Sequence, residues 1–236
     1  MSQHQRTLYA RVIARYRKEA ATNPAAQLGV IHFLRRICSD PLVEEPYQAD
    51  RSSVEEILQA SPKMAWLMQA LHQIRQRQEK VIVFCEFRDL QRTLQRCIAA
   101  RLDVHPDIIN GDTSASSSHV DSRQKRLKAF QSKPGFGVIV LSPLAVGFGV
   151  NIQAANHVIH FTRTWNPAKE DQATDRAYRI GQEREVFVYY PVVVADDFVS
   201  FDEKLDKLLD WKRALSADML NGSGEISVAE LLEIAE

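Results

Sequence analysis

The pattern of apolar positions divides the chain into a helical start, a middle in which strands and helices alternate, and a helical end. Residues 81–87, VIVFCEF, form an almost continuous apolar run rich in β-branched and aromatic side chains, which is typical of a strand buried on both faces. The apolar residues that follow recur at helical spacing and predict an amphipathic helix over 90–102. The predicted strands are 81–87, 107–110, 138–141, 157–161 and 186–194. The predicted helices are 1–36 with a break at Asn23-Pro24, 61–78, 90–102, 120–130, 167–180 and the stretch from Asp197 onward.

Strands that alternate with helices predict an α/β fold, in which a parallel sheet is flanked by helices. A helical extension precedes the sheet and a C-terminal helix follows it. Residues 40–61 are acidic and rich in turn-forming residues, which predicts a surface connection. Residues 136–162 contain no Asp, Glu, Lys or Arg and are long enough to span a bilayer. Pro143, glycines and several polar residues interrupt this stretch, which therefore predicts a buried strand, a loop and a second buried strand.

The charge of the chain changes the picture only when its distribution is considered. The sequence has 30 Lys+Arg and 30 Asp+Glu, and a net charge of zero argues against a simple basic nucleic-acid binder. Residues 1–184, however, hold 26 Lys+Arg and 18 Asp+Glu, a net of +8, and residues 185–236 hold 4 and 12, a net of −8. The zero is a cancellation between a basic body and an acidic end, so nucleic-acid binding stays open.

The composition limits the classes of protein to which this chain can belong. At 45% hydrophobic and 25% charged, the chain is globular rather than of low complexity. The three cysteines, Cys38, Cys85 and Cys97, follow no metal-ligand spacing, so we expect no metal site, no disulfide framework and a reducing cytoplasm. The segment MSQHQRTLYA lacks an apolar core, so no signal peptide is expected and the protein is expected to be soluble.

The segment 165–182, WNPAKEDQATDRAYRIGQ, carries the most specific pattern. Asn166 is a good N-cap and Pro167 suits the first helical position, while Gly181 is placed to end the helix. The spacing predicts one polar helical face that presents two arginines beside an amide and a carboxylate. Its members are Gln172, Asp175, Arg176 and Arg179. Such guanidinium groups can bind the γ-phosphate of a nucleotide, although an ordinary solvated helix with an Asp/Arg ladder has the same spacing.

Two loops that follow predicted strands suit phosphate binding. In SPLAVGFGVNI, residues 142–152, glycines allow a close backbone approach to a ligand, although a tight turn between buried elements explains them equally well. In the other loop, Gly111-Asp112-Thr113-Ser114 precedes a basic helix that begins near Arg123, and together they can grip a nucleic-acid backbone. A capped helix with a solvated basic face is the alternative.

The sequence lacks the residue patterns that several kinds of functional site require. No GxxxxGK[ST] motif is present, so the chain alone has no usual cradle for nucleotide phosphates. Asp202-Glu203 falls in a helical run and is not interpreted as a magnesium site. His157 and His160 lie on a predicted strand without a third ligand, and we expect them to be packed or hydrogen-bonded rather than metal-bound.

Taken in chain order, VIVFCEF, then GDTS with Arg123 and Phe130, then LSPLAVGFGVNI and the segment 165–182 resemble the C-terminal motor lobe of the Swi/Snf-type ATPases of helicase superfamily two. This group includes the chromatin remodellers and their bacterial relatives, and the resemblance runs from about Gln5 to Leu220. It implies a RecA-like sheet in residues 62–195, preceded by a helical extension (1–61) that links to a first lobe. A C-terminal helix and acidic tail (196–236) follow. A bacterial source, with location in the cytoplasm at the nucleoid, is expected.

The resemblance also implies roles for individual residues. Arg176 and Arg179 would act as arginine fingers on ATP·Mg²⁺, which is bound mainly by the first lobe of the same polypeptide. The further nucleotide-site residues would be Gln172, Asp175, Gly147, Gly149 and Asn151. The residues that would contact double-stranded DNA are Gly111, Thr113, Ser142, Arg123 and Trp165. No metal ligand in this chain and no membrane partner are expected, and the protein partners stay open.

The function implied is that of an ATP-dependent DNA translocase that moves along duplex DNA without separating its strands, with the isolated second lobe inactive. A different reading is a degenerate lobe that serves as a DNA-binding or protein-docking module. The sequence departs from the family at three positions: Glu86, where Gln is usual, Val146, where Gly is usual, and Thr162, where Asp is usual.

Overall fold

The computed structural model describes residues 1–19, 25–42, 49, 51–113, 122–145, 151–178 and 181–218. The chain forms two compact units. One contains Met1–Lys63 together with Val192–Glu236, and the other contains Met64–Pro191.

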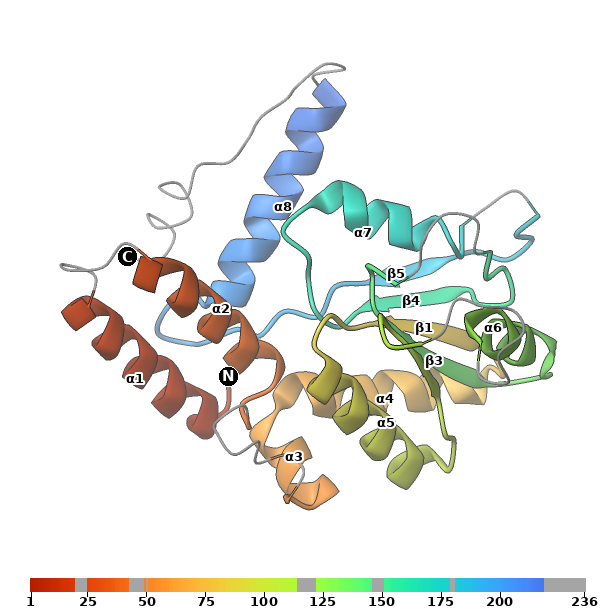
Figure 1. Ribbon diagram of the computed structural model, residues 1–236, viewed down its shortest axis with the longest axis horizontal. Coiled ribbons are helices and arrows are strands. Elements are labelled where there is room, and N and C mark those ends of the chain that lie inside the picture. The colour runs from red at the N-terminus through yellow and green to blue at the C-terminus, as the bar shows by residue number, and fades with distance from the viewer. Residues whose placement is uncertain are drawn as a thin grey trace. The chain divides into compact units, whose positions relative to one another are not determined.

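The second unit is built on a five-stranded sheet with the order β2-β3-β1-β4-β5 (Figure 1). Its strands are β1 (Lys80–Phe84), β2 (Asp107–Ile109), β3 (Gly137–Leu141), β4 (His157–His160) and β5 (Phe187–Tyr189). Every neighbouring pair is parallel, and the central residue Ile82 of β1 pairs with Ile139 of β3 and Val158 of β4. The predicted parallel α/β sheet is therefore confirmed.

Helices cover both faces of this sheet because alternate strand residues point to opposite sides. In Figure 1, α4 (Pro62–Gln76) and α5 (Arg88–Leu102) lie on one side and α7 (Pro167–Thr174) on the other. The buried cluster beneath α7 and α6 (Arg123–Ser132) includes every second strand residue. Its members are Ile82, Phe84, Ile109, Leu127, Phe130, Ile139, Leu141, Ala145, Ile152, Ala155, Val158, Ala173 and Ala177.

The first unit is helical. Its elements are α1 (Gln3–Glu19), α2 (Ala25–Ser39), α3 (Val54–Ala60) and α8 (Phe201–Asp218). The buried side chains of Lys63 and Asp202 form an ion pair, and Asp202 also accepts a hydrogen bond from the Val193 N–H at 2.9 Å. Asp202 thus has a structural partner, consistent with the expectation that it is not a magnesium ligand.

Several predicted elements differ from those observed. The strand predicted over 186–194 is only Phe187–Tyr189, because β5 is an edge strand and Pro191 has no N–H to donate to a ladder. The connection predicted over 40–61 contains α3, which begins with a capping box between Ser53 and Glu56 and buries Ile57. The helix predicted over 167–180 ends at Thr174, where N–H groups bond to carbonyls three residues back, as Arg176 does to Ala173.

The strand predicted over 81–87 also ends early. The Cys85 N–H still donates to the Leu141 carbonyl at 2.9 Å, but side chains take the place of the ladder after it, since Gln91 Nε2 donates to the Cys85 carbonyl at 2.7 Å and the Glu86 N–H donates to Thr162 Oγ1 at 2.9 Å. The charge-free stretch 136–162 contains the buried strands β3 and β4, as predicted. Within the described ranges, none of the helices combines the length and apolarity that crossing a bilayer requires.

Candidate functional site

The loop after β2 is a tight turn held by its own polar side chains. The Asp112 N–H donates to Asn110 Oδ1 at 3.0 Å, and the Asn110 N–H donates to Thr113 Oγ1 at 3.2 Å. The Thr113 hydroxyl accepts in this bond. Gly111 lies in the turn, where an added Cβ would come within 3.1 Å of the Arg88 guanidinium.

The loop after β3 begins beside this turn. Ser142 donates its N–H to the Ile109 carbonyl at 2.8 Å and accepts from the Ala145 N–H at 3.0 Å, which fixes the backbone at the end of β3. Ser142 itself is largely buried. The structure thus brings Gly111, Thr113 and Ser142 together at the carboxyl ends of adjacent strands.

Arg123 joins these two loops from the first turn of α6. Its guanidinium donates to the carbonyls of Thr113 at 3.1 Å, Ala145 at 3.0 Å and Asn110 at 3.4 Å. Three of its five N–H donors are therefore used inside the protein. The proposed contact between Arg123 and DNA stays a prediction, whereas its role in holding both loops is observed.

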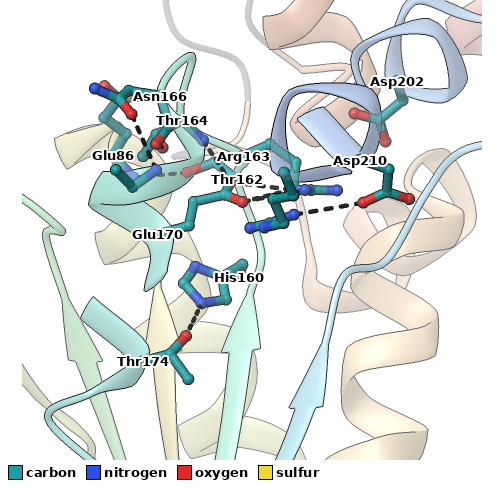
Figure 2. A network of polar contacts seen from close by, with 12 residues as sticks. Glu86, His160, Thr162, Arg163, Thr164, Asn166, Glu170, Thr174, Asp202 and Asp210 are labelled. Atoms are coloured by element: carbon teal, nitrogen blue, oxygen red, sulfur yellow. Dashed lines mark hydrogen bonds and ion pairs between the residues drawn. The ribbon is translucent and has the colours of Figure 1, made fainter. Parts of the chain in front are cut away.

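The segment after β4 is organised by a buried ion pair (Figure 2). Arg163 Nε donates to Glu170 Oε1 at 2.9 Å, and Glu170 Oε1 also accepts from the Thr164 N–H at 2.8 Å. Asn166 caps α7 by accepting from the Ala168 N–H at 2.9 Å, and Pro167 starts the helix, as predicted. Trp165, which is half-buried, directly precedes the cap residue Asn166 in the chain. No signal in the sequence pattern had indicated the Arg163–Glu170 pair.

Two polar groups, one before β4 and one after α7, are buried without a hydrogen-bond partner in the described part of the chain. They are Arg176 Nε and Asn151 Oδ1. The Ile152 N–H donates to the Arg176 carbonyl at 2.8 Å, so the backbone segments that carry the two side chains run next to each other. A buried guanidinium donor without an acceptor costs free energy that an anionic ligand would recover, and a nucleotide phosphate fits it.

The other predicted nucleotide residues differ in position. Gln172 is exposed on α7, and Asp175, also exposed, follows the last helical residue. Because the helix ends at Thr174, Asp175 and Arg176 belong to a tighter turn and not to the continuous helical face that the spacing predicted. Arg179, Gly147 and Gly149, together with Val146, lie outside the described residues.

The predicted DNA residues and the predicted nucleotide residues are joined by one stretch of chain. Residues 142–151 begin at the end of β3, beside the Gly111 turn, and reach the Arg176 backbone at Ile152.

The two strand histidines have partners. His157 lies 2.7 Å from Glu79 Oε2 and 3.1 Å from the Tyr189 hydroxyl, and His160 Nε2 lies 2.9 Å from Thr174 Oγ1 (Figure 2). Partial burial raises the pKa of the Glu79 carboxyl, but hydrogen bonds from His157 and Asn156 lower it by more. The pKa of Glu79 is therefore below its ordinary value. Among the described residues, no group of three His, Cys, Asp or Glu side chains could hold a metal ion.

Comparisons with known proteins match this architecture. Residues 62–181 match the family model described as helicase conserved C-terminal domain. The chain is 48% identical over 233 residues to Zorya protein ZorD of Escherichia coli O139:H28, covering 96% of this chain and 21% of that protein. It is 31% identical over 210 residues to the putative ATP-dependent helicase/translocase YwqA of Bacillus subtilis, covering 88% of this chain and 21% of that protein. The chain therefore spans about a fifth of the length of these relatives.

Solved structures give the same result. The C-terminal domain of the Sulfolobus solfataricus SWI2/SNF2 ATPase superposes with a TM-score of 0.70 at 26% identity, covering 98% of this chain and 92% of that one. The core domain of the same ATPase gives a TM-score of 0.73 at 28% identity and covers 99% of this chain and 46% of that one. The RecA-like form of the sheet is thereby confirmed. The chain belongs to the helicase conserved C-terminal domain family, and within it to the C-terminal lobes of Snf2-type ATPases.

Proposed function

We propose that this chain is the second lobe of an ATP-dependent translocase on double-stranded DNA, and that Arg176 and Arg179 are its arginine fingers. The observation that carries the proposal is the Arg176 guanidinium, which is buried while its Nε has no hydrogen-bond partner in the described part of the chain. The relative YwqA, described as a putative ATP-dependent helicase/translocase, supports the same activity.

In this proposal the ATP site is shared between two lobes. The first lobe of the same polypeptide would bind Mg²⁺ and the phosphates, since this chain has no GxxxxGK[ST] motif. Arg176 would offset negative charge on the transferred phosphoryl group, and a buried guanidinium does so more strongly than a solvated one. Asn151 Oδ1 would accept a hydrogen bond from the nucleotide or its water, with Gln172 and Asp175 at the rim and Gly147 and Gly149 in the connecting loop.

The DNA would lie against the carboxyl ends of the strands. The Thr113 and Ser142 hydroxyls can donate to phosphate oxygens, and Gly111 allows the backbone to approach closely. Trp165 follows the adjacent strand β4, and Arg123 holds the loops that would carry these contacts. Such a motor would act in the cytoplasm, on DNA of the bacterial nucleoid.

The test is the substitution Arg176→Ala in the full-length polypeptide. We expect DNA-stimulated ATP hydrolysis to fall by about 10³–10⁵, because the arginine acts on charge that develops in the transition state. The measurement is steady-state phosphate release with and without duplex DNA. Arg101→Ala, which removes an exposed arginine in the last turn of α5, is the matched control and should keep normal turnover. Unchanged hydrolysis in Arg176→Ala would contradict the proposal and favour a lobe that only docks DNA or a protein.

A further inference from the structure

The Gln182 side chain lies where the segment 153–155, the turn at Ala177 and its own segment meet. Its Nε2 donates to the carbonyls of Gln153 at 2.9 Å, Ala155 at 3.0 Å and Ala177 at 3.3 Å. Its Oε1 accepts from the Arg184 N–H at 3.1 Å. One amide therefore ties the segment after the glycine loop to the turn that carries Arg176.

The backbone strengthens the same junction. The Ile152 N–H donates to the Arg176 carbonyl at 2.8 Å, and Arg184 donates to the Ala154 carbonyl at 2.9 Å. Ile152, Ala155 and Ala177 are fully buried. Carbonyls at such a junction must be paired within the protein, since leaving one unpaired costs about 1–3 kcal/mol. The two segments are thus locked in one relative position.

Gly181 allows Gln182 to reach this place. Its φ of +98° is a conformation that side-chain-bearing residues rarely adopt, and an added Cβ would lie 2.7 Å from Gln153 Nε2. The Gly-Gln pair after the arginines therefore has a physical reason: glycine for the turn and the close approach, and glutamine for the clamp.

We propose that Gln182 is a positioning residue that holds Arg176 in register with the Asn151 segment, so that the arginine meets the nucleotide correctly. This inference rests on the proposed function. Gln182 touches no nucleotide in this scheme, and it acts through the carbonyls next to Arg176 and Ile152.

The experiment uses Gln182→Glu in the full-length polypeptide. The carboxylate keeps the shape of glutamine but cannot donate, and three carbonyls would face a negative charge. We expect kcat of the DNA-stimulated ATPase to fall about 10²-fold, as for a displacement of a catalytic group by about 1 Å, with KM for ATP unchanged. We also expect the double variant with Arg176→Ala to be no slower than Arg176→Ala alone, since both changes remove the same contribution.

The matched control is Gln95→Glu. Gln95 Nε2 also donates to one backbone carbonyl, that of Pro106 at 2.7 Å, and it belongs to α5. This variant should lower Tm to a similar extent and leave kcat unchanged. If Gln182→Glu lowers only Tm, as the control does, while Arg176→Ala abolishes turnover, the positioning role is wrong and the proposed function stands. If Arg176→Ala itself turns over normally, the proposed function fails, and the positioning role fails with it.

Discussion

Two buried arginines in the sheet unit have opposite surroundings. Arg163 is matched by the Glu170 carboxylate and lies 4.2 Å from the centroid of the Tyr190 ring. Arg176 Nε has no acceptor in the described part of the chain. A matched guanidinium such as that of Arg163 stabilises the fold. The sequence pattern singles out Arg176 and gives no sign of the Arg163–Glu170 pair, and the contacts of the two arginines distinguish the paired guanidinium from the one that we propose acts on the nucleotide.

The contrast predicts that Arg163→Ala acts on stability. Removing the guanidinium leaves the Glu170 charge buried without its partner, which should lower the free energy of unfolding by about 3–5 kcal/mol. Urea denaturation followed by far-UV circular dichroism measures this change. The double variant Arg163→Ala/Glu170→Ala should lose less than the two single changes summed. Strict additivity would show that the pair does not act as a unit.

At the scale of elements, α6 serves the loops rather than the sheet alone. Its first residue, Arg123, reaches carbonyls from the ends of both β2 and β3, so the helix adds three hydrogen bonds to the backbone bond from the Ser142 N–H to the Ile109 carbonyl. The basic character of this helix suggested phosphate contacts, but for Arg123 most of the donors are used within the protein.

Arg123→Ala should therefore weaken the fold and DNA binding together. Losing donors to three carbonyls is expected to lower the free energy of unfolding by about 1–3 kcal/mol. The freed loops should also bind duplex DNA less tightly, as measured by fluorescence anisotropy. Lys128→Ala removes an exposed charge on the same helix and should change stability by less than about 0.5 kcal/mol. Equal effects of the two substitutions would mean that Arg123 contributes only its charge.

The elements that the sequence predicts well are those with strong local signals. The apolar runs of β1 and β3 and the Asn166-Pro167 start of α7 are all found in place. The misses have non-local causes that compete with periodicity. The edge position of β5 depends on the topology of the whole sheet, and the early end of α7 depends on a tertiary bond from Ile152 to Arg176. The Gln182 clamp likewise joins residues whose proximity no spacing reveals.

At the scale of the whole molecule, charge is separated along the chain. Residues 1–184 carry a net charge of +8 and contain every proposed phosphate contact. Residues 185–236, which follow them, carry a net charge of −8. A chain that contacts few phosphates should bind duplex DNA weakly and lose affinity with salt.

Titration of the 236-residue chain with labelled duplex DNA at several salt concentrations tests this expectation. If about one phosphate is neutralised, by Arg123 as the charged residue among the proposed DNA contacts, the logarithm of the binding constant should fall with the logarithm of salt concentration with a slope of about −1. Binding that does not change with salt would contradict a contact made mainly to phosphates.

The position of β1 in the sheet has a consequence for how the chain is made. Of the five strands of the sheet, β1 is synthesised first. Its two neighbours, β3 and β4, are completed only at Leu141 and His160. Until His160 leaves the ribosome, the apolar segment Lys80–Phe84 lacks at least one of the strands that pair with it. Unpaired apolar strands of this kind aggregate readily, so nascent chains that end before β4 should depend on chaperones, and a fragment cut between β3 and β4 should be insoluble.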